Sequence, residues 1–215
     1  MIDLVSLTTK INNKIKRILS KDTVYAKVSY SQQGEDLIVN FIFSEGFKIS
    51  KPTYLDIGAH HPFFLSNTFF FYKKGCRGVL VEPDPILVKQ LKQYRQDDIC
   101  LNVGVSDKNM TSDFYIMQSR SLNTFSKEKA EALSRDTSFN CPKIDNIVKV
   151  SMLNINTIIE KYFSNIPNFI SIDAEGLDLE ILSSLDFSRY SPEIFCIECV
   201  GVAGVDSIKD KEIID

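Results

Sequence analysis

Two carboxylates, Asp56 and Glu82, each stand at the tip of a short apolar run, where they could bind a ligand. Asp56 lies in the run 54–58, and Gly58 lets the backbone come close to a ligand. Glu82 ends the run 78–82, and a carboxylate at the end of the second strand of a nucleotide-binding α/β unit usually accepts hydrogen bonds from ribose hydroxyls. Together the two tips predict a site for an adenosine-containing cofactor. The alternatives are a capping role for Asp56 and a surface position for Glu82.

The turn after Asp56 differs from the glycine-rich turn that binds dinucleotides. The G-x-G-x-x-G pattern would need glycines where the chain has His60 and Phe63. A pyrophosphate needs close backbone approach there, so the turn disfavours NAD and FAD, whereas S-adenosylmethionine has no phosphate. His60 and His61 could act as bases near neutral pH, but a place inside this turn favours packing or hydrogen bonding beside the cofactor.

A second group of acids follows the fourth predicted strand, within residues 173–180. Asp178 and Glu180 would complement the dipole of the helix that starts there. Asp173 and Glu175 are better placed to face a ligand cleft. There they could bind the methionine end of the cofactor, accept a proton from a hydroxyl or hold a divalent ion, and the residues alone do not choose among these roles.

Short apolar strands alternate with helical patterns, which is typical of a doubly wound, mostly parallel, Rossmann-like α/β sheet. Strands are predicted at 53–57, 78–82, 99–103, 169–172 and 194–198, with further extended segments at 113–117 and 147–152. Helices are predicted near 32–42, 64–74, 85–95, 155–163, 178–185 and from about 207. The polar stretch 119–145 has no clear period and is predicted to be a lid or an insertion.

Composition narrows the class of protein further. The chain has 215 residues with 44% hydrophobic residues, which suits one domain, and its net charge of −3 disfavours nucleic acid as the main partner. It has no apolar run near 18 residues and no signal-peptide pattern. Five irregularly spaced cysteines suit free thiols in a reducing cytosol, so we predict a cytoplasmic protein. The Cys196/Cys199 pair lies on an expected buried strand, so we predict no metal site there.

The N-terminal residues 1–29 form a separate basic extension of the domain 30–215. Within it, residues 4–21 carry apolar and basic residues at spacings of three and four, which predicts an amphipathic helix. We favour a helix docked on the domain or on a second subunit. The alternative is a helix that lies on an anionic membrane surface.

Several of these segments resemble the FkbM family of S-adenosylmethionine-dependent methyltransferases. The resemblance covers about residues 30–200, and the matching segments are 31–36, 54–62, 66–68, 77–83, 102–107 and 169–180. The Asp-x-Glu-Gly run at 173–176 is the most specific of them. The turn reads Gly-Ala-His-His-Pro rather than the commoner Gly-Ala-Asn, as in a branch of the family often found with surface-polysaccharide genes.

The resemblance implies a class I methyltransferase fold that binds S-adenosylmethionine and methylates a hydroxyl, often of a sugar. It implies a small-molecule or saccharide acceptor as the partner. The residues that it places on the cofactor are Gln33, Glu35, Asp56, Gly58, Ala59, His60, Glu82, Pro83, Asn102 and Asp173, with Asn102 near the adenine. Asp173 or Glu175 would take the hydroxyl proton or orient the acceptor.

A complete fold of this class has a terminal antiparallel strand pair after its fifth strand. This chain ends soon after Glu198, so we expect the sheet to lack that pair and to leave the strand 194–198 at an exposed edge. Three hypotheses follow, of which an O-methyltransferase is favoured. The others are a cofactor-binding module without turnover and an oxidoreductase with a nucleotide cofactor. The oligomeric state is left open.

Overall fold

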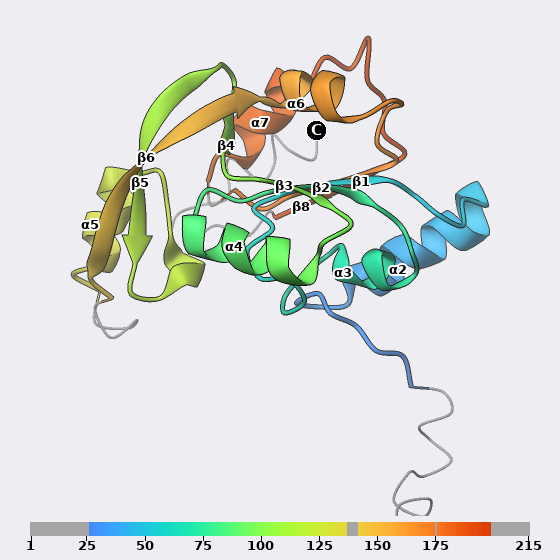
Figure 1. The fold of residues 1–215 in the computed structure, drawn as a ribbon, viewed down its shortest axis with the longest axis horizontal. Coiled ribbons are helices and arrows are strands. Elements are labelled where there is room, and N and C mark those ends of the chain that lie inside the picture. Colours follow the sequence, from blue (N-terminus) through green and yellow to red (C-terminus); the bar gives the residue numbers. More distant parts are fainter. Residues whose placement is uncertain (1–25, 137–141, 175, 199–215) are drawn as a thin grey trace, which may run out of the picture.

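The computed structural model describes residues 26–136, 142–174 and 176–198, and its centre is a five-stranded parallel sheet (Figure 1). The strand order is β3-β2-β1-β7-β8, and each neighbouring pair is parallel. The strands are β1 (Tyr54–Ile57), β2 (Gly78–Val81), β3 (Ile99–Leu101), β7 (Phe169–Ile172) and β8 (Ile194–Ile197). The chain builds outward from β1 in one direction and then from β7 in the other. The predicted doubly wound parallel sheet is therefore confirmed.

Helices cover both faces of this sheet (Figure 1). One face carries α2 (Glu35–Phe41), which continues into a π-helical stretch (Ile42–Phe47), together with α3 (Phe69–Lys73) and α4 (Pro85–Tyr94). The other face carries α6 (Ile155–Tyr162) and α7 (Asp178–Ser184). This arrangement buries the central strands β1, β2 and β7 on both sides, which is why their sequences are continuous apolar runs rather than alternating patterns.

The alternation of side chains along β1 divides the core into two layers. Leu55 and Ile57 are fully or almost fully buried and pack in one cluster with Ile155 and Ile158 of α6. Tyr54 is buried in the other cluster, which lies on the side of α2 and α3. Because successive residues of a strand point to opposite faces, Asp56 also faces the α2–α4 layer and away from α6 and α7.

The helix α4 begins as its sequence predicts. Asp84 is the N-cap, and its Oδ1 accepts hydrogen bonds from the backbone N–H groups of Ile86 at 2.8 Å and Leu87 at 3.4 Å. Pro85 stands at the first helical position, where its missing N–H costs nothing. These features explain why the predicted start of this helix is confirmed.

Helix α3 is shorter than its prediction over 64–74 because a turn occupies the first part of that range. Leu65 has a positive φ of 55°, and Ser66 Oγ accepts the N–H of Phe69, the first residue of α3. The helix ends as predicted at Gly75, whose φ of 83° is the left-handed value that favours glycine.

A second sheet of three strands, in the order β4-β6-β5, extends the domain to one side (Figure 1). Its strands are β4 (Gly104–Ser106), β5 (Met110–Met117) and β6 (Ile144–Asn154), and β5 and β6 pair antiparallel. The sequence predicted only short pieces of β5 and β6, and it missed β4 as a separate strand. Both long strands exceed their predicted bounds because they pair along their whole length in one antiparallel ribbon, in which many residues are exposed.

The polar stretch between β5 and β6 contains regular structure that the sequence did not reveal. A 3-10 turn, η3, covers Arg120–Leu122, and α5 covers Lys127–Leu133. Ala130 and Leu133 of α5 are buried against Tyr115 and Met117 of β5. The sequence predicts a lid or an insertion at 119–145 but no helix there. It missed α5 because the apolar contacts of this helix are too few to give a clear pattern in the sequence.

Three expectations lie outside the described residues. They are the amphipathic helix at 4–21 of the N-terminal extension, the helix from about residue 207, and the question of a terminal strand pair after β8. Within the described residues, no helix is both long and apolar enough to cross a membrane.

Candidate functional site

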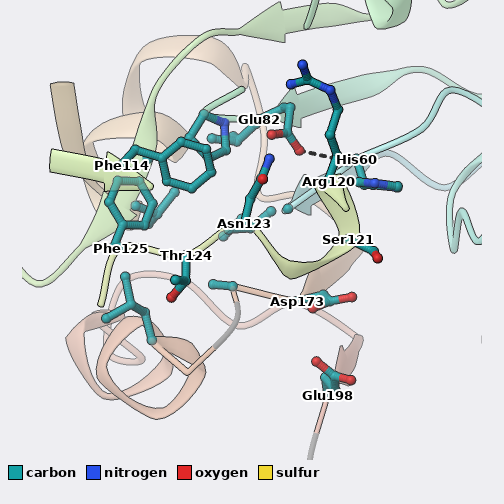
Figure 2. A pocket seen from close by; sticks show the side chains of 18 of the residues that line it. His60, Glu82, Phe114, Arg120, Ser121, Asn123, Thr124, Phe125, Asp173 and Glu198 are labelled. Atoms are coloured by element: carbon teal, nitrogen blue, oxygen red, sulfur yellow. Dashed lines mark hydrogen bonds between the residues drawn. The ribbon is translucent and has the colours of Figure 1, made fainter. Parts of the chain in front are cut away.

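A pocket of about 390 Å³ lies at the carboxyl ends of the central strands (Figure 2). The turn after β1 and the ends of β2, β7 and β8 form one part of its wall, through Gly58, Glu82, Asp173 and Glu198 among others. A second part comes from the strands β4 and β5, the residue before β4 and the segment between β5 and β6, through Val103, Val105, Phe114, Arg120, Ser121, Asn123, Thr124 and Phe125. This is the place where open α/β sheets bind ligands, because the strand order reverses there.

Glu82 is the most deeply buried carboxylate of the pocket wall, with 4% of its surface exposed. Its Oε2 accepts the backbone N–H of His60 at 2.8 Å, and its Oε1 accepts the backbone N–H of Asp84 at 2.8 Å (Figure 2). Burial raises the pKa of Glu82 to about 7, although both backbone hydrogen bonds oppose this shift. Each oxygen still has a lone pair that can accept a ligand hydroxyl.

The turn after β1 brings the backbone close to the end of β7. Gly58 has a φ of 81°, and a Cβ at this position would lie 1.8 Å from the carbonyl oxygen of Asp173, so only glycine fits. His60 also has a positive φ, 48°, which aims its N–H at Glu82. Burial lowers the pKa of the His60 imidazole, so this side chain is neutral at pH 7.

Asp84 attaches the segment after β5 to the pocket. Besides capping α4, its carboxylate accepts hydrogen bonds through Oδ2 from the Arg120 guanidinium and from Asn123 Nδ2, the latter at 3.0 Å. Asn123 in turn accepts the backbone N–H of Met117 at 2.8 Å. The fully buried carboxylate of Asp84 therefore holds both the start of α4 and the pocket-wall segment that contains Arg120 and Asn123.

The aromatic rings of Phe114 and Phe125 give the pocket an apolar side. Their centroids are 4.7 Å apart, and both side chains line the pocket with Val103 and Val105. Phe125 also packs against Gly104, where a Cβ would lie 2.6 Å from the ring. A flat heteroaromatic group could lie on such a wall, beside a carboxylate that accepts hydroxyl hydrogen bonds.

The family model of the methyltransferase FkbM domain matches residues 56–207. The chain belongs to the FkbM methyltransferase family. The match to the family model starts at Asp56. It therefore includes the turn after β1, the end of β2, the second sheet and β7. No curated protein and no solved structure matches the chain.

Five residues of the predicted cofactor set line the pocket of this FkbM domain: Gly58, His60, Glu82, Pro83 and Asp173. They come from the turns after β1, β2 and β7, which adjoin in the sheet because β1 pairs with both other strands. Their roles toward a cofactor stay predictions.

Three further predicted residues lie behind the wall rather than in it. Asp56 is buried, and its Oδ2 accepts the hydroxyl of Thr68 at 2.6 Å, while burial raises its pKa. Ala59 is buried, with its N–H bonded to the carbonyl of Val81. Asn102 donates from Nδ2 to the carbonyl oxygens of Glu82 at 3.0 Å and Pro83 at 2.8 Å. The contacts of Asp56 and Asn102 position the turns of the site, and neither side chain lines the pocket.

Two more predicted residues, Gln33 and Glu35, do not line the pocket. Glu35 is at the start of α2, where its Oε2 accepts the backbone N–H of Gln33 at 2.8 Å. Gln32, which precedes Gln33, lines the pocket instead. Glu175 lies outside the described residues.

The wall residues that the sequence did not single out come mainly from the second sheet and its connection. Arg120, Asn123, Phe114 and Phe125 have no motif around them. Contacts with Asp84, Gly104 and the strand β5 hold their segment at the site. Among the described residues, no three His, Cys, Asp or Glu side chains come together in a way that could hold a metal ion.

Proposed function

We propose that this chain transfers the methyl group of S-adenosylmethionine to a hydroxyl group of a saccharide or a small hydroxylated metabolite. The observation that carries the proposal is Glu82, a buried carboxylate at the end of β2 on the wall of the pocket. A carboxylate at that position suits the two hydroxyls of a ribose. The family match supports methyl transfer as the reaction class.

In the proposed binding mode, the ribose lies on Glu82 and the adenine extends toward Phe125 and Val103. The amino-acid end of the cofactor then points past Gly58 toward Asp173. The turn at Gly58 lies in close backbone contact with the end of β7, since a Cβ there would lie 1.8 Å from the carbonyl oxygen of Asp173. The absence of a second glycine in this turn, where His60 stands, disfavours a pyrophosphate and therefore a dinucleotide.

The bound cofactor would supply a methyl group on a positively charged sulfur. The protein's own contribution would be to hold the acceptor hydroxyl in line with that methyl group and to exclude competing water. A hydroxyl that becomes an ether must lose its proton. Asp173 is the proposed proton acceptor because it lines the pocket. Glu175 is the other candidate for this proton.

Calorimetric titration with S-adenosylhomocysteine tests the cofactor class directly. We expect micromolar binding by the chain and at least a tenfold loss in Glu82→Ala. Glu160→Ala is the matched control, because Glu160 is an exposed glutamate on α6 that pairs with Arg189 at 3.4 Å. A folded protein that binds NAD(H) but no S-adenosylhomocysteine would contradict the proposal and favour an oxidoreductase.

The proposed setting is the cytoplasm, next to the machinery of polysaccharide synthesis. The support is the His-His-Pro form of the turn, the cysteine usage and the basic stretch 4–21. For this stretch we favour a helix docked on the domain or on a second subunit, and peripheral contact with an anionic membrane is the alternative. Binding to vesicles of anionic phospholipid, compared between the full chain and a chain without residues 1–21, tests this contact, and equal binding by both would exclude it.

A further inference from the structure

The helix α2 and the π-helical stretch after it have apolar side chains on two opposite sides. Val39 and Phe43 are buried in the core on the inner side. On the outer side, Ile38 and Phe41 are 60% and 61% exposed, and Ile42 beside them is 37% exposed. Because positions three and four apart lie on one face of a helix, these three side chains form one surface, here called the α2 stripe.

The α2 stripe is an apolar surface without a cover. A helix that is apolar on all sides is typical of one that is buried on all sides. Among residues 26–136, 142–174 and 176–198, however, only the inner side of α2 is covered. Adjoining apolar side chains at a surface mark a place where another segment or molecule docks. The question is therefore which segment or molecule covers the α2 stripe.

The chain enters the domain beside the start of α2. Asp36, in the first turn of α2, accepts hydrogen bonds from the backbone N–H of Tyr30 at 2.7 Å and from the hydroxyl of Ser29 at 2.6 Å. Figure 1 shows this entering segment on the side of the domain that carries α2 and α3. Residues 22–28 can span about 23 Å at full extension. Packed helices need only about 10 Å between their axes, so the preceding stretch 4–21 can reach back along α2.

The stretch 4–21 also has a suitable length and pattern. Its residues lie outside the described part of the chain, and its sequence predicts an amphipathic helix. Such a helix would be about 27 Å long, which is enough to cover the roughly 20 Å of Glu35–Phe47. Its apolar side would consist of five residues at spacings of three and four: Leu4, Leu7, Ile11, Ile15 and Ile18.

The charges of the two segments are opposite. The stretch 4–21 carries five basic residues and no acid. The segment Glu35–Phe47 carries no Lys or Arg, and its acids Glu35 and Glu45 lie at the surface. Two lysines flank this segment and are bonded to it: Lys48 to Glu45 at 3.3 Å and Lys74 to Asn40 at 2.6 Å. Attraction between these charges would add to the burial of the α2 stripe.

We propose that residues 4–21 form a basic amphipathic helix that packs its apolar side on the α2 stripe of the same chain. The proposal rests on the docking that the proposed function favours for this stretch, and it does not depend on methyl transfer. It assigns to the N-terminal extension a fixed place on the α2 side of the domain. The anchor at Asp36 makes this docking intramolecular, so it needs no second copy and no membrane.

Trypsin cleavage of the full chain tests the proposal. A helix of this length is marginal in water on its own, so trypsin would cut it rapidly at its basic residues if it were not docked. We would follow cleavage within residues 10–21 by mass spectrometry in the wild type and in Ile38→Gln/Phe41→Gln. A second variant, Ile11→Gln/Ile15→Gln, changes the other side of the contact and leaves the domain itself intact.

We expect both double variants to be cleaved about fivefold faster than the wild type or more, because cleavage follows the population of the undocked form. The control is Ile147→Gln on β6, an isoleucine that is 51% exposed, which should be cleaved at the wild-type rate. Circular dichroism checks that the domain of each variant is folded.

Three results would overturn the proposal. The first is cleavage of both double variants at the rate of the wild type. The second is protection of the wild type that is lost on dilution, since a second copy would then be the occupant of the α2 stripe. The third is protection that appears only with vesicles of anionic phospholipid, since the membrane would then cover the extension. None of these results depends on whether the chain binds S-adenosylhomocysteine.

Discussion

The backbone N–H of His60 donates a hydrogen bond of 2.8 Å to Oε2 of Glu82, and this bond ties the turn after β1 to the end of β2. It forms because His60 adopts a left-handed backbone conformation, φ 48°. Glu82 is thus held from two sides, by His60 and by the N–H of Asp84. The carboxylate has a fixed position before any ligand arrives, which lowers the entropic cost of binding.

Burial of Glu82 should make the stability of the protein depend on pH. The pKa of this carboxyl is raised from 4.5 to about 7, so the folded protein holds its proton where the unfolded chain has lost it. This contribution to stability is complete below pH 4.5 and is lost as the pH rises through 7. It amounts to about 3 kcal/mol at most.

Urea denaturation of the wild type and Glu82→Gln at pH 5, 6, 7 and 8 measures this effect. We expect the free energy of unfolding of the wild type to fall relative to that of the variant over this range. A constant difference would show that Glu82 is ionised throughout in the free protein.

Replacement of Gly58 by alanine should abolish ligand binding. The new Cβ would lie 1.8 Å from the carbonyl oxygen of Asp173, so β1 and β7 would have to separate at the pocket. We expect a loss of stability of about 2 kcal/mol or more and no detectable binding of S-adenosylhomocysteine.

Gly34→Ala is the control for the backbone strain alone. Gly34 has a similar φ of 95°, but nothing lies within 4 Å of its Cβ position. It should lose about 1 kcal/mol of stability and retain binding. If both variants behaved alike, the close approach to β7 would not be what requires glycine at position 58.

The pair of Asp84 and Arg120 should couple energetically. The Asp84 side chain is fully buried, and the Arg120 side chain is 29% exposed. A double-mutant cycle with Asp84→Ala and Arg120→Ala should give a coupling energy of about 1–2 kcal/mol in the free energy of unfolding. Arg120→Ala should also weaken S-adenosylhomocysteine, because the segment that carries Asn123 loses one of its anchors.

The exposed pair of Lys149 and Asp113 provides the comparison. Its charged atoms are 2.8 Å apart, but the side chains are 73% and 44% exposed. Its coupling energy should stay within about 0.5 kcal/mol. An equally small value for Asp84 and Arg120 would mean that the segment is held by its other contacts.

Arg95 should be among the residues most sensitive to substitution. Its guanidinium is 1% exposed and donates hydrogen bonds to Asp98, Tyr54, Thr68 and the carbonyl of Pro62 at 2.9–3.2 Å. Lysine has one ammonium group and cannot reach these four acceptors together. We expect Arg95→Lys to lower the free energy of unfolding by about 3 kcal/mol or more, measured by urea denaturation.

Arg77→Lys is the matched substitution at the surface. Arg77 pairs with Asp97 at 2.7 Å, and their side chains are 42% and 61% exposed. Its cost should stay below about 1 kcal/mol. A small cost at Arg95 as well would mean that water or rearranged side chains replace its hydrogen bonds.

The sequence was sufficient where a local pattern has one physical solution. The apolar run at 78–81 could only be a strand buried on both faces, and the Asp84-Pro85 pair could only begin a helix. The order of such units then predicted a parallel sheet with Glu82 and Asp173 at its carboxyl edge, and both residues line the pocket.

What the tertiary structure decided is which polar residue faces the pocket and which supports it. Asp56 and Glu82 look alike in the sequence, yet Asp56 is turned to Thr68 and Glu82 to the pocket, since they stand at different positions of their strands. The second sheet adds Phe125 and Arg120 through contacts between residues far apart in the chain. Such contacts depend on the packing of whole elements, which a local pattern of residue types does not encode.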